Sequence, residues 1–251
     1  YGGRRGFFGT RGRTVPAVAD VSLKVGKGQS VAVVGESGSG KSTLAKCIVG
    51  LEVPERGDIF INGENVARLT RSELQPHRKM VQMIFQDPFA SLNPRQKVGE
   101  IISLGPRIQG TEKEEAWAMA RELLQTVGLN PQSAERYPHE FSGGQRQRIG
   151  IARALAIKPQ LIIADEPVSS LDVSVQKQVL ELLAELRQTL SLSMLFITHD
   201  LRVAAHVCEH IVVMRDGKLV ERGSTRDIFA NPQHPYTKEL LDSVPGKSWL
   251  H

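Results

Sequence analysis

The sequence lacks long hydrophobic runs and is poor in cysteine. No apolar run approaches the roughly 20 residues that span a bilayer, so no membrane-crossing helix is predicted. The first residues show no secretory signal pattern. The two cysteines, Cys47 and Cys208, are far apart and fit neither a zinc site nor a disulfide framework, which favours a reducing compartment.

Dense basic clusters interleaved with aromatic residues, typical of nucleic-acid surfaces, are also missing. The net charge is only +5, and its one notable cluster is a Gly- and Arg-rich stretch over residues 4–13. We therefore expect a solvated surface and no nucleic-acid partner. The 251 residues are 40% hydrophobic, enough for one large domain or a domain with an added lobe.

The strongest local pattern is a nine-residue glycine-rich stretch between an apolar run at residues 31–34 and a helical pattern at residues 44–49. It consists of Gly35, Glu36, Ser37, Gly38, Ser39, Gly40, Lys41, Ser42 and Thr43. Glycines let the backbone form a nest of N–H groups that binds a polyphosphate at a helix N-terminus. Lys41 is expected to reach the β- and γ-phosphates, Ser42 to bind Mg²⁺, and Thr43 to lie near the α-phosphate. An ordinary glycine-rich turn is the alternative, which the full spacing and both flanks weaken.

Hydrophobic periodicity predicts alternating strands and helices around this stretch. The predicted strands are residues 18–25, 58–63, 80–86, 161–166 and 194–198, with a hairpin of 210–214 and 218–221 around Asp216 and Gly217. The predicted helices are residues 112–127, a segment after residue 145, and residues 174–190. This order indicates a doubly wound α/β core with antiparallel strands beside the nucleotide strand and a mainly helical insertion at residues 88–157.

Two acids close the continuous apolar strand at residues 161–166. In a phosphate-loop protein, Asp165 would hold Mg²⁺ opposite the loop hydroxyl, and Glu166 would accept a proton from the attacking water. We expect their side chains to diverge, because adjacent residues on a strand point to opposite sides. The alternative is a pair of solvated acids at a strand end.

A second candidate anion site, Ser142-Gly143-Gly144-Gln145, precedes a helical pattern. Ser142 is expected to cap that helix, and the two glycines would expose backbone N–H groups. A simple N-cap turn is the alternative.

Together these motifs resemble the ATP-binding subunit of an ABC transporter. The resemblance covers nearly the whole chain: the Walker A loop, the Q-loop at Gln86, a signature that begins at Phe141, Walker B, the D-loop ending at Asp172 and the switch His199. Phe141 stands where leucine is commoner, and Ala164 precedes the Walker B aspartate. Both changes keep an apolar residue.

The resemblance implies a P-loop NTPase (RecA-like) core with an antiparallel β subdomain and a helical subdomain. Residues 1–87 and 158–251 would form the ATP-binding core, and residues 88–157 the helical subdomain. It also implies catalytic roles for Glu166, His199 and Gln86, a metal role for Gln86 beside Ser42 and Asp165, and ATP contacts from Asp172 and from residues 142–145. Tyr1 is the expected aromatic under adenine, with Phe7 or Phe8 as alternatives.

Longer strings resemble the oligopeptide, dipeptide and nickel importer subfamily. They lie at residues 85–95, 136–141 and 231–237. This resemblance implies a head-to-tail dimer with a second ABC ATPase subunit or domain, on the cytoplasmic face of the inner membrane. Its partners would be transmembrane permease subunits and, indirectly, a solute-binding protein. A soluble ABC ATPase acting on nucleic acid or ribosomes, and an inactive structural cassette, are the competing hypotheses. The transported substrate stays open.

Overall fold

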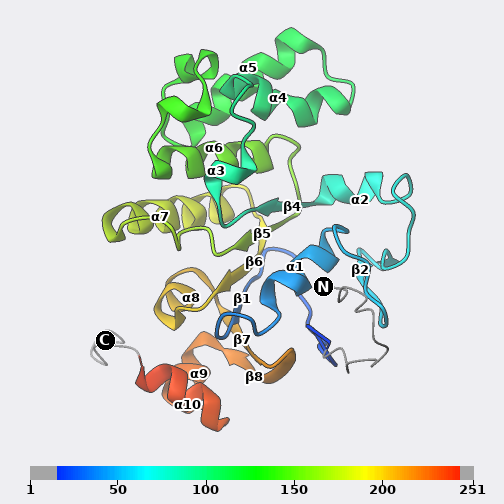
Figure 1. The fold of residues 1–251 in the computed structure, drawn as a ribbon, viewed down its shortest axis with the longest axis vertical. Helices are drawn as coiled ribbons and strands as arrows, with labels where there is room; N and C mark the ends of the chain where they lie inside the picture. The colour runs from blue at the N-terminus through cyan, green and yellow to red at the C-terminus, as the bar shows by residue number, and fades with distance from the viewer. Residues whose placement is uncertain (1–15, 244–251) are drawn as a thin grey trace, which may run out of the picture.

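The protein is built on a six-stranded sheet in the part of the chain that the structure, a computed structural model, describes, residues 16–243 (Figure 1). The strand order is β4-β5-β6-β1-β7-β8. The strands are β1 (Ser30–Val34), β4 (Val81–Ile84), β5 (Leu161–Asp165), β6 (Ser193–Thr198), β7 (His210–Arg215) and β8 (Lys218–Ser224). Neighbouring strands are parallel, except that β8 runs antiparallel to β7. A separate two-stranded sheet joins β2 (Phe60–Ile61) to β3 (Glu64–Asn65).

The helices fall into three stretches of the chain. Before β4 lie α1 (Lys41–Ile48) and α2 (Gln75–Met80). Between β4 and β5 lie α3 (Pro88–Ser91), α4 (Val98–Ile108), α5 (Lys113–Thr126), the short 3₁₀ helices Pro131–Glu135 and Pro138–Glu140, and α6 (Gly143–Leu155). After β5 come α7 (Val173–Thr189), α8 (Leu201–Val207), α9 (Thr225–Ala230) and α10 (Pro235–Asp242). The helices α3 to α6 lie within residues 88–157 and gather at one end of the molecule (Figure 1).

Both faces of the sheet are buried, which explains the continuous apolar strands. In β1, Ala32 and Val34 pack into a core with residues of α4 to α10, whereas Val31 and Val33 face a second core with Ala45 of α1. The other central strands divide their side chains between the same two cores. Figure 1 shows α7 and α8 on one side of the sheet and α1 on the other.

The predicted strand at residues 18–25 is wrong: the structure assigns no strand there. Val21, Leu23 and Val25 pack partly buried against the second core. Their alternation therefore reflects packing on one face, without a paired backbone. The strand predicted at residues 58–63 shortens to Phe60–Ile61. The strand predicted at residues 80–86 shortens to β4 at both ends: α2 extends through Met80, and the strand ends at Ile84, before Phe85 and Gln86.

Candidate functional site

Four adjacent strands end at one edge of the sheet, and the candidate residues follow those ends. In register, Val34 pairs with Thr198, Ile197 with Asp165, and Ala164 with Ile84. The glycine-rich loop, His199, Glu166 and Gln86 therefore follow neighbouring strands in spatial order. The carboxyl edge of a parallel sheet is the usual ligand site in open α/β folds.

Lys41 is buried inside the loop. Its ammonium donates hydrogen bonds to the backbone oxygens of Gly35 at 2.7 Å and Glu36 at 2.8 Å, and lies 3.5 Å from the Ser39 hydroxyl. Burial lowers the pKa of Lys41, against the opposing charges of Glu166, Asp165 and Glu36. A desolvated cation inside a nest of N–H groups suits a polyphosphate, because charge-assisted contacts are strong there.

The loop backbone is fixed by its neighbours. A Cβ atom at Gly35 would collide with the carbonyl oxygen of Met214 in β7. Gly40, at φ 98°, has a left-handed conformation that favours glycine, and a Cβ there would collide with the carbonyl oxygen of Ala17. The N–H of Gly217, in the turn between β7 and β8, donates to the Ser39 oxygen at 3.1 Å. The loop shape is thus set by contacts with the hairpin as well as by its own glycines.

Ser42 and Asp165 meet across the site. The Ser42 hydroxyl donates to Asp165 Oδ1 at 2.9 Å. Burial raises the pKa of Asp165, and the bond from Ser42 opposes that rise. Hydroxyl and carboxylate oxygens are ligands that Mg²⁺ prefers, so this pair fits the ion. No group of three His, Cys, Asp or Glu residues within 16–243 could hold a metal. A Mg²⁺ ion here would therefore also need phosphate or water oxygens.

Glu166 lies between Gln86 and His199. Its Oε2 atom accepts a hydrogen bond from Gln86 Nε2 at 3.2 Å and lies 3.4 Å from His199 Nδ1. Its side chain is 15% exposed, against 58% for His199. Gln86 Nε2 also lies 3.4 Å from the Ser169 hydroxyl, a contact that the sequence analysis missed. The cluster holds one carboxylate beside an amide and an imidazole.

The predicted reason for the divergence of Asp165 and Glu166 is wrong. The strand ends at Asp165, and Glu166 has a left-handed backbone with φ 43°. Its N–H donates to the oxygen of Ile197 on β6 at 2.9 Å. A sharp turn after the strand therefore sets the direction of Glu166, whereas Asp165 still belongs to the strand.

Ser142 caps α6, as the sequence predicts. Its hydroxyl accepts from the N–H of Gln145, whose Oε1 accepts from the N–H of Ser142 at 3.0 Å. A Cβ atom on Gly144 would collide with Val175 of α7, so α6 approaches α7 closely at this point. Asp172 caps α7, and hydrogen bonds from the Ser174 hydroxyl and the Val175 amide lower the pKa of Asp172.

The two candidate anion sites are not joined. Within residues 16–243, no hydrogen bond or ion pair links residues 142–145 or Asp172 to residues 35–43. The helix α6 packs instead against β4, α7 and α3 to α5. Tyr1, Phe7 and Phe8, the candidates for adenine stacking, lie outside the described residues.

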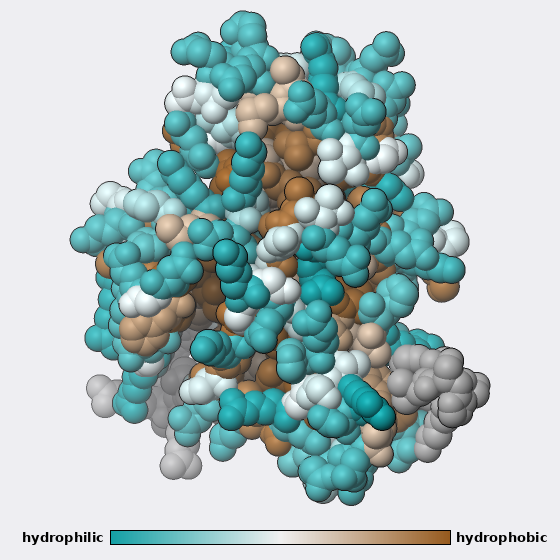
Figure 2. Space-filling model, turned by 180° about the vertical axis from the view of Figure 1, so that it is seen from behind, coloured by the Kyte–Doolittle hydropathy of each residue, from teal (hydrophilic) through white to brown (hydrophobic). Residues whose placement is uncertain are grey.

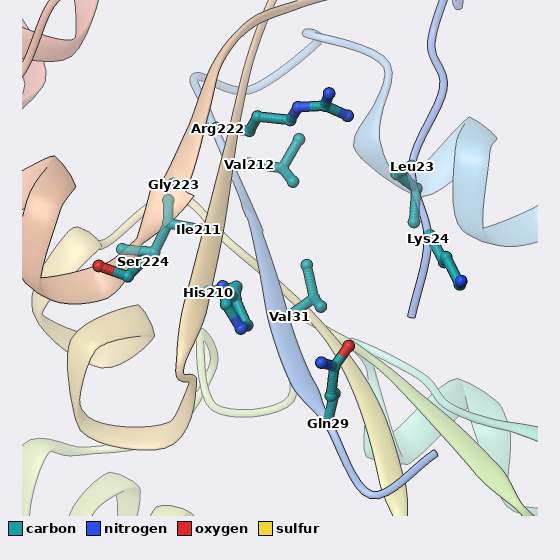
Figure 3. Close-up of a pocket in the computed structure, with 10 residues that line it drawn as sticks. All are labelled: Leu23, Lys24, Gln29, Val31, His210, Ile211, Val212, Arg222, Gly223 and Ser224. Carbon is teal, nitrogen blue, oxygen red and sulfur yellow. The ribbon is translucent and has the colours of Figure 1, made fainter. Parts of the chain in front are cut away.

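A hollow of about 390 Å³ lies elsewhere, between β1, β7, β8 and the segment at Leu23 (Figure 3). It is lined by Leu23, Lys24, Gln29, Val31, His210, Ile211, Val212, Arg222, Gly223 and Ser224. Val31 and His210 lie near the starts of their strands, whereas the loop follows the end of β1. None of the predicted site residues lines this hollow.

Sequence reasoning also missed Tyr236, a buried residue of α10 whose hydroxyl accepts from the N–H of Glu36 at 2.9 Å. The only signal was its place in the string at residues 231–237.

The surface in Figure 2 is mostly hydrophilic. Across residues 16–243, every helix is too short or too polar to cross a bilayer.

Comparisons with known proteins identify the family. Residues 18–169 match the ABC transporter family, and residues 220–248 match the C-terminal region of oligopeptide/dipeptide transporters. The chain belongs to the ABC transporter family.

Three relatives illustrate the similarity. The oligopeptide transport ATP-binding protein OppF of Bacillus subtilis is 52% identical, over 95% of this chain and 79% of its own length. A putative peptide import ATP-binding protein of Brucella ovis is 49% identical, over 95% of this chain and 76% of its own length. The glutathione import ATP-binding protein GsiA of Salmonella choleraesuis is 48% identical over 96% of this chain, which spans 39% of that protein.

Solved ABC structures share the fold. The ATP-binding cassette MJ0796, in a dimeric post-hydrolysis state with ADP and Pi, has a TM-score of 0.75 and 32% identity, over 84% of this chain and 91% of that one. The cbiO1 protein of Clostridium perfringens, part of an ABC transporter complex, has a TM-score of 0.77 and 26% identity, over 86% of this chain and 84% of that one. These findings confirm the predicted family, the P-loop NTPase fold and the ATPase activity.

Proposed function

We propose that this ATPase drives the uptake of peptides or related small solutes, as a peripheral subunit on the cytoplasmic face of the inner membrane. The names of the relatives, which include peptide and glutathione import proteins, support this substrate class. The match to the oligopeptide/dipeptide transporter C-terminal region supports it independently. Permease subunits would carry the solute, delivered by a solute-binding protein.

Residues 35–43 would bind the ATP phosphates. The nest of N–H groups would hold the phosphate oxygens, and Lys41, whose ammonium has three donors, would keep its bond to the Gly35 oxygen while it reaches the β- and γ-phosphates. Ser42 and Asp165, already 2.9 Å apart, would hold Mg²⁺ together with Gln86. When bound, Mg²⁺ neutralises charge on the phosphates. Tyr1 stays the proposed adenine contact.

Glu166 would accept the proton of the attacking water. Its carboxylate is the acceptor nearest both Gln86 and His199 in this cluster. Gln86 would hold the carboxylate and the water in place, and His199 would contact the γ-phosphate. This arrangement is the single observation that carries the proposed mechanism of ATP hydrolysis, because it gathers a base, an amide and an imidazole at the edge where the loop begins.

A second copy, or a related ABC subunit, would complete each site. Ser142, Gly143, Gly144 and Gln145, with Asp172, lie on α6, α7 and their caps, unconnected to the loop of the same chain. In a head-to-tail dimer these residues would contact the ATP held by the loop of the partner. The dimeric state of the MJ0796 cassette with ADP and Pi supports this arrangement.

Coupling to the membrane would run through Gln86. It lies between the end of β4 and the start of α3, so its side chain contacts Glu166 while its backbone leads into the helical segment at residues 88–157. Permease docking on that segment would shift Gln86 and hence the cluster. Conformational steps of this kind often set the turnover of an ATPase.

The test is to purify the tagged chain with its partners from membranes and reconstitute the complex into vesicles. We expect permease subunits in the purified complex and uptake of labelled peptides that depends on ATP. The same complex with Lys41→Ala should take up none. Copurification with ribosomes or nucleic acid at physiological salt, without membrane subunits, would overturn the proposal, because non-specific phosphate contacts weaken as salt rises.

A further inference from the structure

A tyrosine from the far end of the described chain contacts the phosphate loop. Tyr236, the second residue of α10, is 1% exposed and packs in the larger core. Its hydroxyl accepts a hydrogen bond from the N–H of Glu36 at 2.9 Å, across 200 residues of sequence. A backbone N–H in the loop thus points away from the nest toward this side chain.

The same peptide unit also holds Lys41. The N–H of Glu36 and the C=O of Gly35 belong to one peptide group, and none of the peptide bonds among residues 16–243 is cis. In a trans peptide these two groups point in opposite directions. The Gly35 oxygen accepts from the Lys41 ammonium at 2.7 Å, while the Tyr236 hydroxyl accepts from the N–H on the other side. The orientation of one peptide plane therefore links Tyr236 to Lys41.

Tyr236 is itself held in place from several directions. Glu221 of β8 accepts the backbone N–H groups of Gln233 at 2.8 Å and His234 at 2.9 Å, which fixes the start of α10. His234 Nδ1 accepts the N–H of Tyr236 at 3.2 Å. The guanidinium of Arg215 lies over the phenol ring, 4.7 Å from its centroid. Burial raises the pKa of Tyr236, so the phenol stays neutral at physiological pH.

We propose that Tyr236 is a positioning residue for ATP binding: its hydroxyl fixes the peptide between Gly35 and Glu36, and through it the ammonium of Lys41. The nucleotide loop is then held by three elements, the β7–β8 turn at Ser39, β7 at Gly35, and α10 at Glu36. The inference rests on the proposed phosphate-binding role of residues 35–43. If Tyr236 has this role, the segment at residues 231–237 contributes to the affinity for ATP.

The test compares Tyr236→Phe, which removes only the hydroxyl, with Tyr137→Phe, the same change at a 38% exposed tyrosine between α5 and α6. ATP affinity with Mg²⁺ is measured by calorimetry on each variant. We expect Tyr236→Phe to raise the Kd for ATP about 3- to 10-fold, the effect of one lost hydrogen bond. The catalytic constant at saturating ATP should stay within about twofold, because the lost contact would stabilise bound ATP and the transition state equally. Tyr137→Phe should match the wild type.

Amide exchange separates positioning from general stability. In the nucleotide-free protein, Tyr236→Phe should speed exchange of the Glu36 amide selectively, whereas general destabilisation would speed exchange across the core strands. Glu221→Gln keeps the tyrosine but weakens the anchor of α10, and should shift affinity in the same direction. Wild-type affinity in Tyr236→Phe, or unchanged exchange at Glu36, would overturn the positioning role. Failure of the wild type to bind ATP, or unchanged affinity in Lys41→Ala, would overturn the proposed function itself.

Discussion

Glu166→Gln is expected to separate nucleotide binding from hydrolysis. In the wild type, Glu166 Oε2 lies 3.2 Å from Gln86 Nε2 and 3.4 Å from His199 Nδ1. The glutamine keeps an oxygen that can accept a hydrogen bond from Gln86, and its amide nitrogen can face His199. The surrounding geometry should therefore survive, and only the proton acceptor is lost. Removal of a positioned base slows a reaction about 10²- to 10⁴-fold, which corresponds to about 2.7–5.5 kcal/mol in activation free energy.

Three measurements test this expectation. Phosphate release at saturating ATP and Mg²⁺ gives the rate, calorimetry gives the ATP affinity, and gel filtration gives the dimer fraction. We expect a slow rate, a retained affinity, and an ATP-dependent dimer that persists because hydrolysis no longer releases it. Glu181→Gln makes the same chemical change at an exposed position of α7, in an ion pair with Lys177 at 3.8 Å, and should behave as the wild type.

Two results would refute this reasoning. Wild-type turnover in Glu166→Gln would show that another group accepts the proton. A dimer that forms equally well without nucleotide would show that ATP is not what closes the interface. Asp165→Asn provides the contrast, because weakening the Ser42–Asp165 pair should impair Mg²⁺-dependent closure rather than trap it.

Three further outcomes are expected. Lys41→Ala should weaken ATP binding about 10- to 100-fold, because a charge-assisted contact is lost, whereas Lys46→Ala on the same helix should leave it unchanged. Equal ATP affinities of the two variants in a titration would contradict the role of Lys41 in phosphate binding. In the wild type, the rate of ATP hydrolysis per chain should rise with protein concentration as dimers form. Ser142→Arg should abolish hydrolysis, while the isolated variant chain still binds ATP. Normal turnover in this variant would exclude a site shared between two chains. Burial raises the pKa of Cys208 from 9.0 to about 12, so the unfolded thiol ionises first as pH rises. The ionisation of this thiol alone should lower the free energy of unfolding by about 1 kcal/mol between neutral pH and about pH 10. Denaturant titrations of Cys208→Ala should lack this pH-dependent part.

Much of the core was predictable because its signals are local. The strand predicted at residues 161–166 forms β5, which ends one residue earlier at Asp165, and the strand predicted at residues 194–198 forms part of β6. The hairpin around Asp216 and Gly217 forms as predicted. The capping pattern at Ser142 also gave the start of α6. In each case the residue types and their spacing determine the structure without distant partners.

The contacts that join distant segments were not predictable in this way. Nothing in the residues near Glu36 indicates that Tyr236 of α10 reaches its N–H. The alternation at residues 18–25 is satisfied equally by a paired strand and by an extended segment packed on a sheet, and the structure contains the second. Periodicity reports which side chains are buried, but it does not report whether the backbone has a partner.

The strand end at Asp165 shows why residue types predicted the site better than its geometry. Two acids after a buried strand indicated the chemistry, but a continuing strand was the wrong basis for their directions. The left-handed backbone of Glu166, at φ 43°, costs about 1–3 kcal/mol for a residue other than glycine and persists only where the surroundings impose it. Here the Ile197 oxygen on β6 accepts the N–H of Glu166, while Gln86 donates to its carboxylate. Neighbouring strands that are distant in sequence therefore hold Glu166 beside Gln86 and His199, while Asp165 stays on the strand to contact Ser42.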